Sequence, residues 1–233
     1  MKKFRWCLFV IYILTNSLQL TAQQKLKEGK ATFEFSYPDE KGIEPDLLDV
    51  AETKQLIVYF RNGMTRVDQK SSIESISELI DQKKKDRIML NHKDSLAITE
   101  TIQENWENQS MMYGDTAAVI TNDAKLIAGY KCRKAIVSYK VWEKADRQIE
   151  IWFTDEIAAS NYRFSFKGIS GFIMEYSYTD ILYPVREGAD FRTKMTCTKV
   201  EGTQVNEQLL QIPPGYVVTT MKELRKNTKV EYH

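Results

Sequence analysis

Apolar and polar residues alternate with a period of two along most of this chain, and this pattern constrains the fold more than any other feature. In residues 30–37, for example, Ala31, Phe33 and Phe35 alternate with polar positions. Successive side chains of a β-strand point to opposite faces, so this alternation predicts a strand with one buried face. Helical periodicity is scarce by comparison. The sequence therefore predicts a mainly β fold of antiparallel strands, with helices as minor parts.

Turn signals separate the predicted strands. Asn62-Gly63 joins two alternating runs and is the strongest short-range hairpin signal in the chain. Residues 86–101 read as a second pair of strands that turns at Asn91 to Asp94. Residues 125–157 predict one long strand, a polar turn at Lys144 to Arg147 and a returning strand. A third pair, in residues 171–200, is interrupted by Pro184 and Gly188.

One segment, residues 71–86, fits two structures. Its isoleucines and leucines fit one face of a helix, and Ser71 with Glu74 can form a capping box. The same residues also fit a strand followed by a lysine-rich turn. No long linker, low-complexity tract or short repeat divides the chain, so residues 23–233 are predicted to form a single β-rich domain.

The N-terminal residues have the layout of an export signal. Basic residues at Lys2, Lys3 and Arg5 precede an apolar stretch, and a polar tail ends near Ala22. The apolar stretch is shorter than the roughly 20 residues that cross a membrane. No cysteine stands near Ala22, where a lipoprotein signal requires one. We therefore predict that residues 1–22 are a cleaved signal peptide and that the exported protein is soluble, neither membrane-spanning nor lipid-anchored.

The charge balance argues against anionic partners. The formal net charge is +1, and losing the three basic residues of the signal lowers it to −2. A nearly neutral protein gives no electrostatic reason to expect nucleic acid or an anionic membrane surface as a partner.

Residues that carry chemistry are few. The two histidines, His92 and His233, lack metal-ligand spacing with each other or with a cysteine. The sequence contains no P-loop, no dinucleotide-binding glycine motif and no nucleophile elbow. A nucleophilic Cys132 would need a base and an orienting partner, which the sequence does not indicate. We therefore predict no catalytic residue, no metal and no cofactor, and a protein that is not an enzyme.

Two cysteines, Cys132 and Cys197, follow the signal segment. An oxidising compartment would allow them to form a disulfide. Cys132 alternates with a mixed set of residues, whereas Cys197 alternates with apolar ones. The residues leave two alternatives open, a disulfide or two small buried thiols.

Aromatic residues are concentrated in the predicted strands. They are explained either by ordinary core packing or by lining a cavity for acyl chains, which a curved sheet with little helix leaves on its concave side. Alternation alone assigns the residues that would line such a cavity: Phe33, Phe35, Val58, Phe60, Val137, Tyr139, Ile151 and Phe153.

Three quoted segments resemble a known family. "KLIAGYKCRKAIVSY", then "IEIWFTDEI" and "FKGISGFIMEY", resemble the central signature of exported Gram-negative envelope proteins of the GLPGLI group and a related uncharacterised-domain family. Ile169-Ser170 stands where the name-giving motif has Leu-Pro, so the chain is more similar to the uncharacterised relatives. The segment "LLQIPPGY" is similar to the ending of LolA/LolB-like lipoprotein carriers.

The resemblance implies a fold and a compartment. The expected fold is one strongly curved antiparallel sheet, an incomplete LolA/LolB-like barrel whose concave face is closed by short helices. Residues 72–80 then become a strand, and the expected location is the periplasm. Gly168 and Gly171 are expected to let the chain turn sharply and pass close to the sheet before it re-enters it.

Two functions from different classes fit these expectations. The first is a soluble periplasmic protein that holds a lipid or a lipoprotein acyl chain in its concave face, without catalysis. The second is an envelope interaction module with a filled core and no small ligand, which presents a sheet edge or loops to a protein partner. An open apolar cavity favours the first, and a packed face with an exposed apolar patch elsewhere favours the second.

Overall fold

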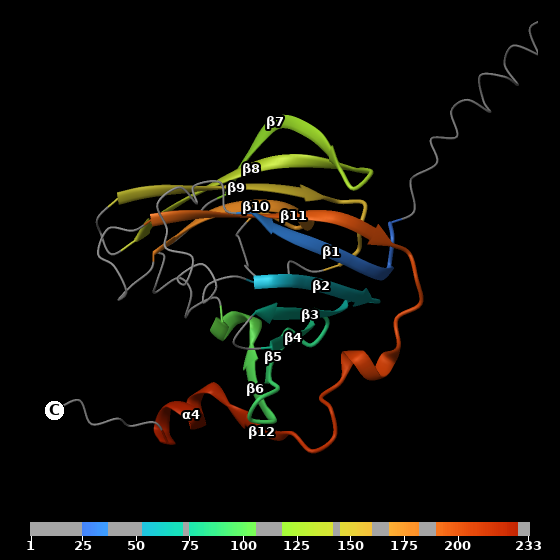
Figure 1. Ribbon diagram of the computed structural model, residues 1–233, viewed down its shortest axis with the longest axis vertical. Coiled ribbons are helices and arrows are strands. Elements are labelled where there is room, and N and C mark those ends of the chain that lie inside the picture. Colours follow the sequence, from blue (N-terminus) through green and yellow to red (C-terminus); the bar gives the residue numbers. More distant parts are fainter. Residues whose placement is uncertain are drawn as a thin grey trace, which may run out of the picture.

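The chain folds into one open, strongly curved sheet (Figure 1). The computed structural model describes residues 25–36, 53–71, 75–105, 118–141, 145–159, 168–181 and 190–227. Twelve strands lie in the order β12-β6-β5-β4-β3-β2-β1-β11-β10-β9-β8-β7. All neighbours pair antiparallel except β12, which pairs parallel with β6. The predicted mainly β fold, a single curved antiparallel sheet that does not close into a barrel, is confirmed.

The described strands, in chain order, are β1 Glu28–Ser36, β2 Thr53–Arg61, β3 Met64–Ser71, β4 Ser75–Asp81, β5 Asp86–Asn91, β6 Leu96–Thr101, β7 Ala118–Ile127, β8 Tyr130–Val141, β9 Ala145–Thr154, β10 Phe172–Ile181, β11 Asp190–Glu201 and β12 Val217–Thr220. The short helices η1 Glu207–Leu210 and α4 Met221–Asn227 lie in the C-terminal part. β4 makes the described part of the ambiguous segment a strand, as the resemblance implied, while residues 72–74 lie outside the described residues.

Two tight hairpins share one turn geometry. Asn62 and Gly63 have φ values of 51° and 90°, which fits a two-residue turn matched to the strand twist. Ala128 and Gly129 repeat it, with φ values of 48° and 86°, and join β7 to β8. The prediction of one uninterrupted strand from residue 125 is therefore wrong, because alternation continues through both arms of this hairpin. The predicted turn at Lys144 to Arg147 is also wrong, since β9 begins at Ala145.

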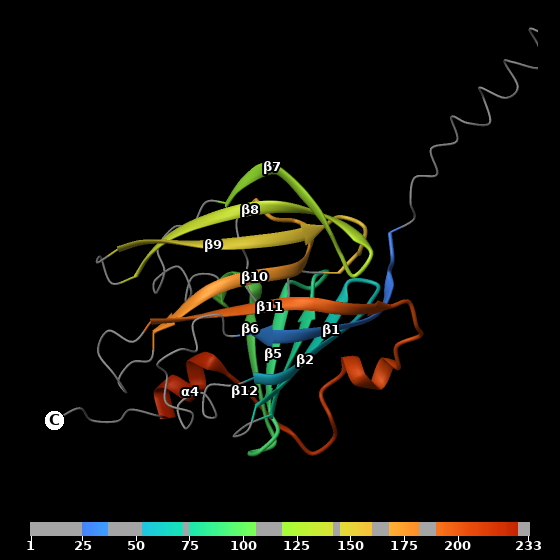
Figure 2. The same ribbon diagram turned by 45° about the horizontal axis from the view of Figure 1, so that its top comes forward.

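The sheet curls so far that its two halves face each other. Figure 2 shows β5 and β6 running steeply across the direction of β8 to β11. At one end, a residue shortly before β1 reaches a residue shortly after β9: Leu26 forms a parallel bridge with Ile157, and the Leu26 N–H donates to the Glu156 carbonyl at 2.8 Å. We call the inward surface the concave face and the outward surface the back face.

The main apolar core lies on the concave face. It gathers residues from β1 to β4 and from β7 to β11, with Phe33, Phe60, Phe153, Phe172 and Tyr176 among its largest fully buried side chains. A second, smaller core lies on the back face of β4 to β6, where Ile212 and Tyr216 cover Leu79, Leu90 and Ala97. No helix among the described residues is long and apolar enough to cross a membrane.

The segment 202–216, which we call the C-terminal strap, crosses the back face and is tied to the sheet along its length. Arg61 Nη1 donates to the Val205 carbonyl and Arg66 Nη1 donates to the Leu209 carbonyl, both at 3.0 Å. Just beyond the strap, the Val217 N–H donates to the Ser95 carbonyl at 2.9 Å, and β12 then extends the sheet beside β6. The strap therefore fixes the back of β2 to β6.

Candidate functional site

The structure brings most of the residues predicted to line a cavity into one core on the concave face. Phe35 packs against this core while partly exposed, and Tyr139 belongs to β8, with its side chain outside the described residues. The other six predicted lining residues are almost fully buried in it: Phe33, Val58, Phe60, Val137, Ile151 and Phe153.

Cross-strand register arranges the concave face in rows. Residues directly opposite each other in an antiparallel pair share a face, so register partners can be followed from strand to strand. One apolar row joins Phe35, Met195, Tyr176, Ile151 and Ala135 across β1, β11, β10, β9 and β8. Two further rows cross the other half, Phe60–Thr65–Ile80–Arg87–Glu100 and Ala31–Val58–Val67–Glu78–Met89–Ile98.

Aromatic contacts across the curl fill the middle of this face. The Phe172 ring lies 5.8 Å from Phe60 and 6.2 Å from Phe33, measured between centroids. Phe172 belongs to β10 and Phe60 to β2, and β11 and β1 lie between these strands in the sheet. Their contact is possible only because the sheet bends back on itself. Since all three rings are at most 1% exposed, side chains occupy this part of the concave face.

Gly168 and Gly171 have different structural roles. Gly168 adopts φ +96°, a conformation that side chains disfavour. A Cβ atom at Gly171 would lie 2.6 Å from Phe153 Cδ2 and 2.7 Å from the Thr154 carbonyl oxygen. The backbone at Gly171 therefore passes directly against β9, just before Phe172 begins β10.

The concave face ends in charged residues on β4 to β6. The Arg87 guanidinium donates to Glu78, with Nη2 3.0 Å and Nε 3.3 Å from its carboxylate oxygens, and Nη1 donates to Glu100. We call these three residues the ion triad. Burial lowers the pKa of Arg87, but the two carboxylates raise it by more, so its pKa is above the ordinary value. Alternation did not identify this group, although a glutamate between Ile76 and Ile80 on an apolar face was a signal for it.

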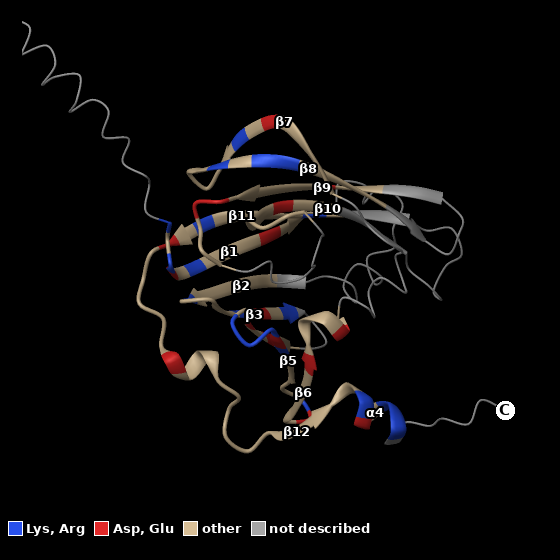
Figure 3. Cartoon of the chain, turned by 180° about the vertical axis from the view of Figure 1, so that it is seen from behind, with Lys and Arg blue, Asp and Glu red and all other residues tan. Residues whose placement is uncertain are grey.

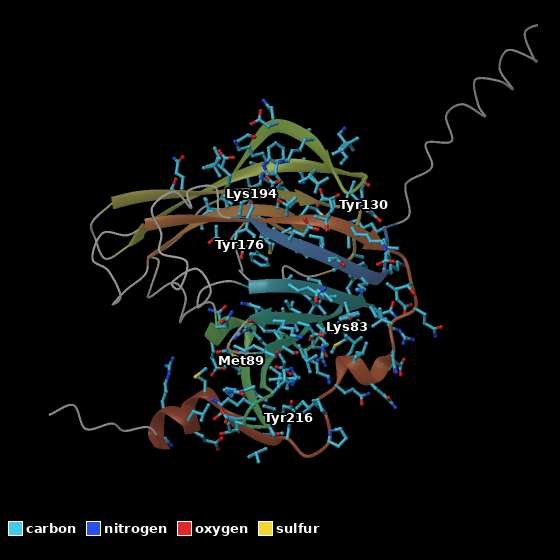
Figure 4. All side chains as sticks on the ribbon, in the orientation of Figure 1. Lys83, Met89, Tyr130, Tyr176, Lys194 and Tyr216 are labelled. Atoms are coloured by element: carbon cyan, nitrogen blue, oxygen red, sulfur yellow. The ribbon has the colours of Figure 1, made fainter. Side chains whose placement is uncertain are left out.

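A polar network on the back face joins the strap to the sheet. Ser77 Oγ lies 2.6 Å from Asp68 Oδ1 and 2.7 Å from His92 Nε2, and His92 Nδ1 lies 2.5 Å from the Tyr216 hydroxyl. Arg66 donates to Asp68 at 2.6 Å and to Ser77 at 3.0 Å. Figure 4 shows Tyr216 beside β12, where the strap meets the sheet.

This serine–histidine contact does not have the arrangement of an activated nucleophile. Ser77 has one hydroxyl proton, and its donation to the Asp68 carboxylate leaves His92 Nε2–H to donate to Ser77. Tyr216 then donates to His92 Nδ1, and every proton in the chain has one acceptor. A histidine that donates to the serine is not acting as its base. Ser77 is also buried, so the network is best described as a latch for the strap.

Both Cys132 and Cys197 are buried free thiols in the structure. Burial raises the pKa of Cys132 to about 11 and that of Cys197 to about 12. Thiols with such pKa values carry almost no thiolate at neutral pH, so neither is poised as a nucleophile or a metal ligand. Within the described residues, no group of three or more His, Cys, Asp or Glu side chains is placed to hold a metal ion.

Neither a family model nor a curated protein matches this sequence. Among solved structures, a LolA superfamily protein from Nitrosomonas europaea matches with a TM-score of 0.32 and 10% identity, over 80% of this chain and 90% of that chain. A similarity of this strength carries no argument about relationship or activity. Membership in the GLPGLI group therefore stays a prediction.

Proposed function

We propose that this protein is a soluble periplasmic binding protein that holds a hydrophobic ligand, a lipid or a lipoprotein acyl chain, against its concave face without catalysis. One observation carries the proposal: a continuous apolar core lines the concave side of one open sheet, from β8 through β1 to β4. The periplasmic location rests on the predicted cleaved signal in residues 1–22 and on the resemblance to exported envelope proteins.

The architecture suits a face that admits a ligand. β7 and β12 form the two ends of the sheet, so the curl can widen without breaking a closed ring of strands. Met174 and Met195, both fully buried, belong to the same core as Tyr176. Methionine side chains are unbranched and adapt to irregular partners at low cost. Entry of an acyl chain requires such rearrangement, because Phe172 and its neighbours now fill the middle of the face.

Burial alone supplies the binding energy in this proposal. Each methylene removed from water contributes about 0.8 kcal/mol, so a long acyl chain gains several kcal/mol without any catalytic group. The thiols of Cys132 and Cys197 are buried and have raised pKa values, and the hydroxyl proton of Ser77 is already donated to Asp68. These features fit a protein that binds its ligand without a chemical reaction.

The test is native mass spectrometry, with lipid extraction, on mature protein purified from a Gram-negative periplasm, together with displacement of a fluorescent fatty-acid probe. A stoichiometric co-purifying lipid or acylated peptide is the expected result. Ala135→Phe adds bulk on the concave face and should weaken probe binding, whereas Ile136→Phe, on the other face of β8, is the matched control. A clean apo mass with no probe binding would reject the proposal.

The second candidate, an envelope interaction module, is favoured by a separate observation. Large apolar side chains are exposed on both end strands: Val119 and Leu126 on β7 are 65% and 72% exposed, and Val217 and Val218 on β12 are exposed as well. Lysine and arginine residues lie along the neighbouring strand β8 (Figure 3). Together with the filled middle of the concave face, these strands fit a partner protein. The same apo mass and absent probe binding would select this candidate.

A further inference from the structure

One buried carboxylate oxygen at the charged end of the concave face has no hydrogen-bond partner among the residues that the structure describes. Side-chain exposure is 16% for Arg87, 18% for Glu78 and only 5% for Glu100. Glu100 uses Oε1 to accept from Arg87, while Oε2 accepts no hydrogen bond from the described residues. A buried polar atom without a partner destabilises a protein by about 1–3 kcal/mol, and by more when it is charged. This carboxylate oxygen is therefore suited to receive a donor.

The ion triad also contains one more negative charge than positive. Arg87 is the only cation among the described residues that pairs with Glu78 or Glu100. Two carboxylates and one guanidinium leave a net charge of −1 where water is largely excluded. Unbalanced charge in such a place is costly, and a bound cation would neutralise it.

The triad and the apolar core belong to the same rows. Phe60, Thr65, Ile80, Arg87 and Glu100 are successive register partners across β2 to β6. Phe60 and Ile80 belong to the main apolar core, and Glu100 lies four strand spacings from Phe60, about 19 Å along the sheet at about 4.8 Å per spacing. Figure 4 shows Tyr176 in the upper part of the sheet and Met89, on β5, in the lower part.

We propose that the concave face binds an amphiphile with a protonated amine head group, whose ammonium lies against Glu100 while its hydrocarbon tail lies along the apolar rows. This inference rests on the proposed function and specifies its ligand class. An ammonium donates three hydrogen bonds and carries the charge that the triad lacks. A carboxylate head group would instead meet a net negative site whose only guanidinium is already held by Glu78 and Glu100.

The experiment measures displacement of Nile red, an uncharged apolar dye, by three amphiphiles with the same tail: dodecylamine, dodecanoate and dodecanol. For the native protein we expect dodecylamine to bind about tenfold or more tighter than dodecanol, the scale of one charge-assisted hydrogen bond. Dodecanoate should bind less tightly than dodecanol.

Glu100→Gln removes the charge and keeps the shape, so it should abolish the preference for the amine over dodecanol. Glu150→Gln is the matched control, because Glu150 pairs with Lys134 3.0 Å away, at 55% side-chain exposure outside the concave face. It should keep the preference. If E100Q does not fold, Glu78→Gln, which also cancels the excess charge, should reduce the preference in its place.

The outcomes separate the two proposals. Equal binding of all three amphiphiles, tighter binding of dodecanoate, or a preference that survives in E100Q would overturn the amine assignment while leaving a hydrophobic site in place. Failure of all three to displace bound dye, or failure of the dye to bind, would instead reject the proposed function and the inference with it.

Discussion

Replacing Gly171 with alanine adds one methyl group at the closest backbone contact between β9 and the entry to β10. The new Cβ would lie 2.6 Å from Phe153 Cδ2, 2.7 Å from the Thr154 carbonyl oxygen and 3.1 Å from the Thr154 carbonyl carbon. Two of these atoms belong to the backbone at the end of β9 and cannot rotate away. Overpacking of this kind costs about 1–3 kcal/mol, and we expect Gly171→Ala to lie near the upper end.

Thermal and urea unfolding of the mature protein measure this cost. For a domain of this size, about 1 kcal/mol corresponds to about 2–4 °C in Tm, so we expect Tm to fall by about 5–10 °C. Gly202→Ala is the matched control, because its Cβ meets only the end of the Leu26 side chain, at 3.2 Å. It should change stability by less than about 0.5 kcal/mol.

A third variant separates crowding from backbone strain. Gly129 has φ +86° and no atom within 4 Å of an added Cβ, so Gly129→Ala tests the cost of the backbone conformation alone. We expect this variant to lose about 1 kcal/mol of unfolding free energy. If Gly171→Ala is no less stable than Gly202→Ala, the close approach of β10 to β9 is absent and the account of this segment fails.

Two other predictions concern the latch and the thiols. Tyr216→Phe removes the donor to His92 and should lower the free energy of unfolding by about 1 kcal/mol. A protease should then cleave the strap of this variant earlier than the sheet. Unchanged protease sensitivity would argue against a latch. The folded-state pKa values of about 11 for Cys132 and about 12 for Cys197 lie above the ordinary thiol value of 9.0, so the unfolded chain releases these protons first as pH rises. Their contribution to the free energy of unfolding is complete below pH 9 and should be lost between pH 9 and about 12. With alanine at both positions, the free energy of unfolding measured by urea titration should fall less steeply over this pH range. An equal fall in both proteins would contradict this prediction.

Alternation predicted the strands well because each buries one face locally. β1 follows directly from Ala31, Phe33 and Phe35, and the β2–β3 hairpin follows from Asn62-Gly63. The β7–β8 hairpin was missed since Ala128, a residue that seldom adopts positive φ, occupies its turn. β12 was missed because it is four residues long and its partner β6 lies more than a hundred residues earlier, so no local pattern marks it.

The polar groups were harder to predict, because each assembles from distant elements. The latch draws on β3, β4, the turn after β5 and the strap, and no spacing in the sequence relates Ser77 to Tyr216. The sequence signal for the ion triad was weak: charged residues stand among apolar ones on β4 to β6. Strand register joins them, and register depends on pairing that a single sequence does not display.

The aromatic cluster sets a lower limit on the ligand that the proposed site would hold. A ligand that enters between the halves of the curl replaces the contacts of Phe172 with Phe33 and Phe60. Two aromatic pairs contribute about 1–3 kcal/mol beyond their buried area, which about two to four methylenes offset at about 0.8 kcal/mol each. Small apolar molecules would therefore leave the cluster closed, whereas each methylene beyond that number should strengthen binding about fourfold. The filled state of the concave face is thus compatible with a binding protein for long acyl chains, and it makes chain length the property that such a protein would select.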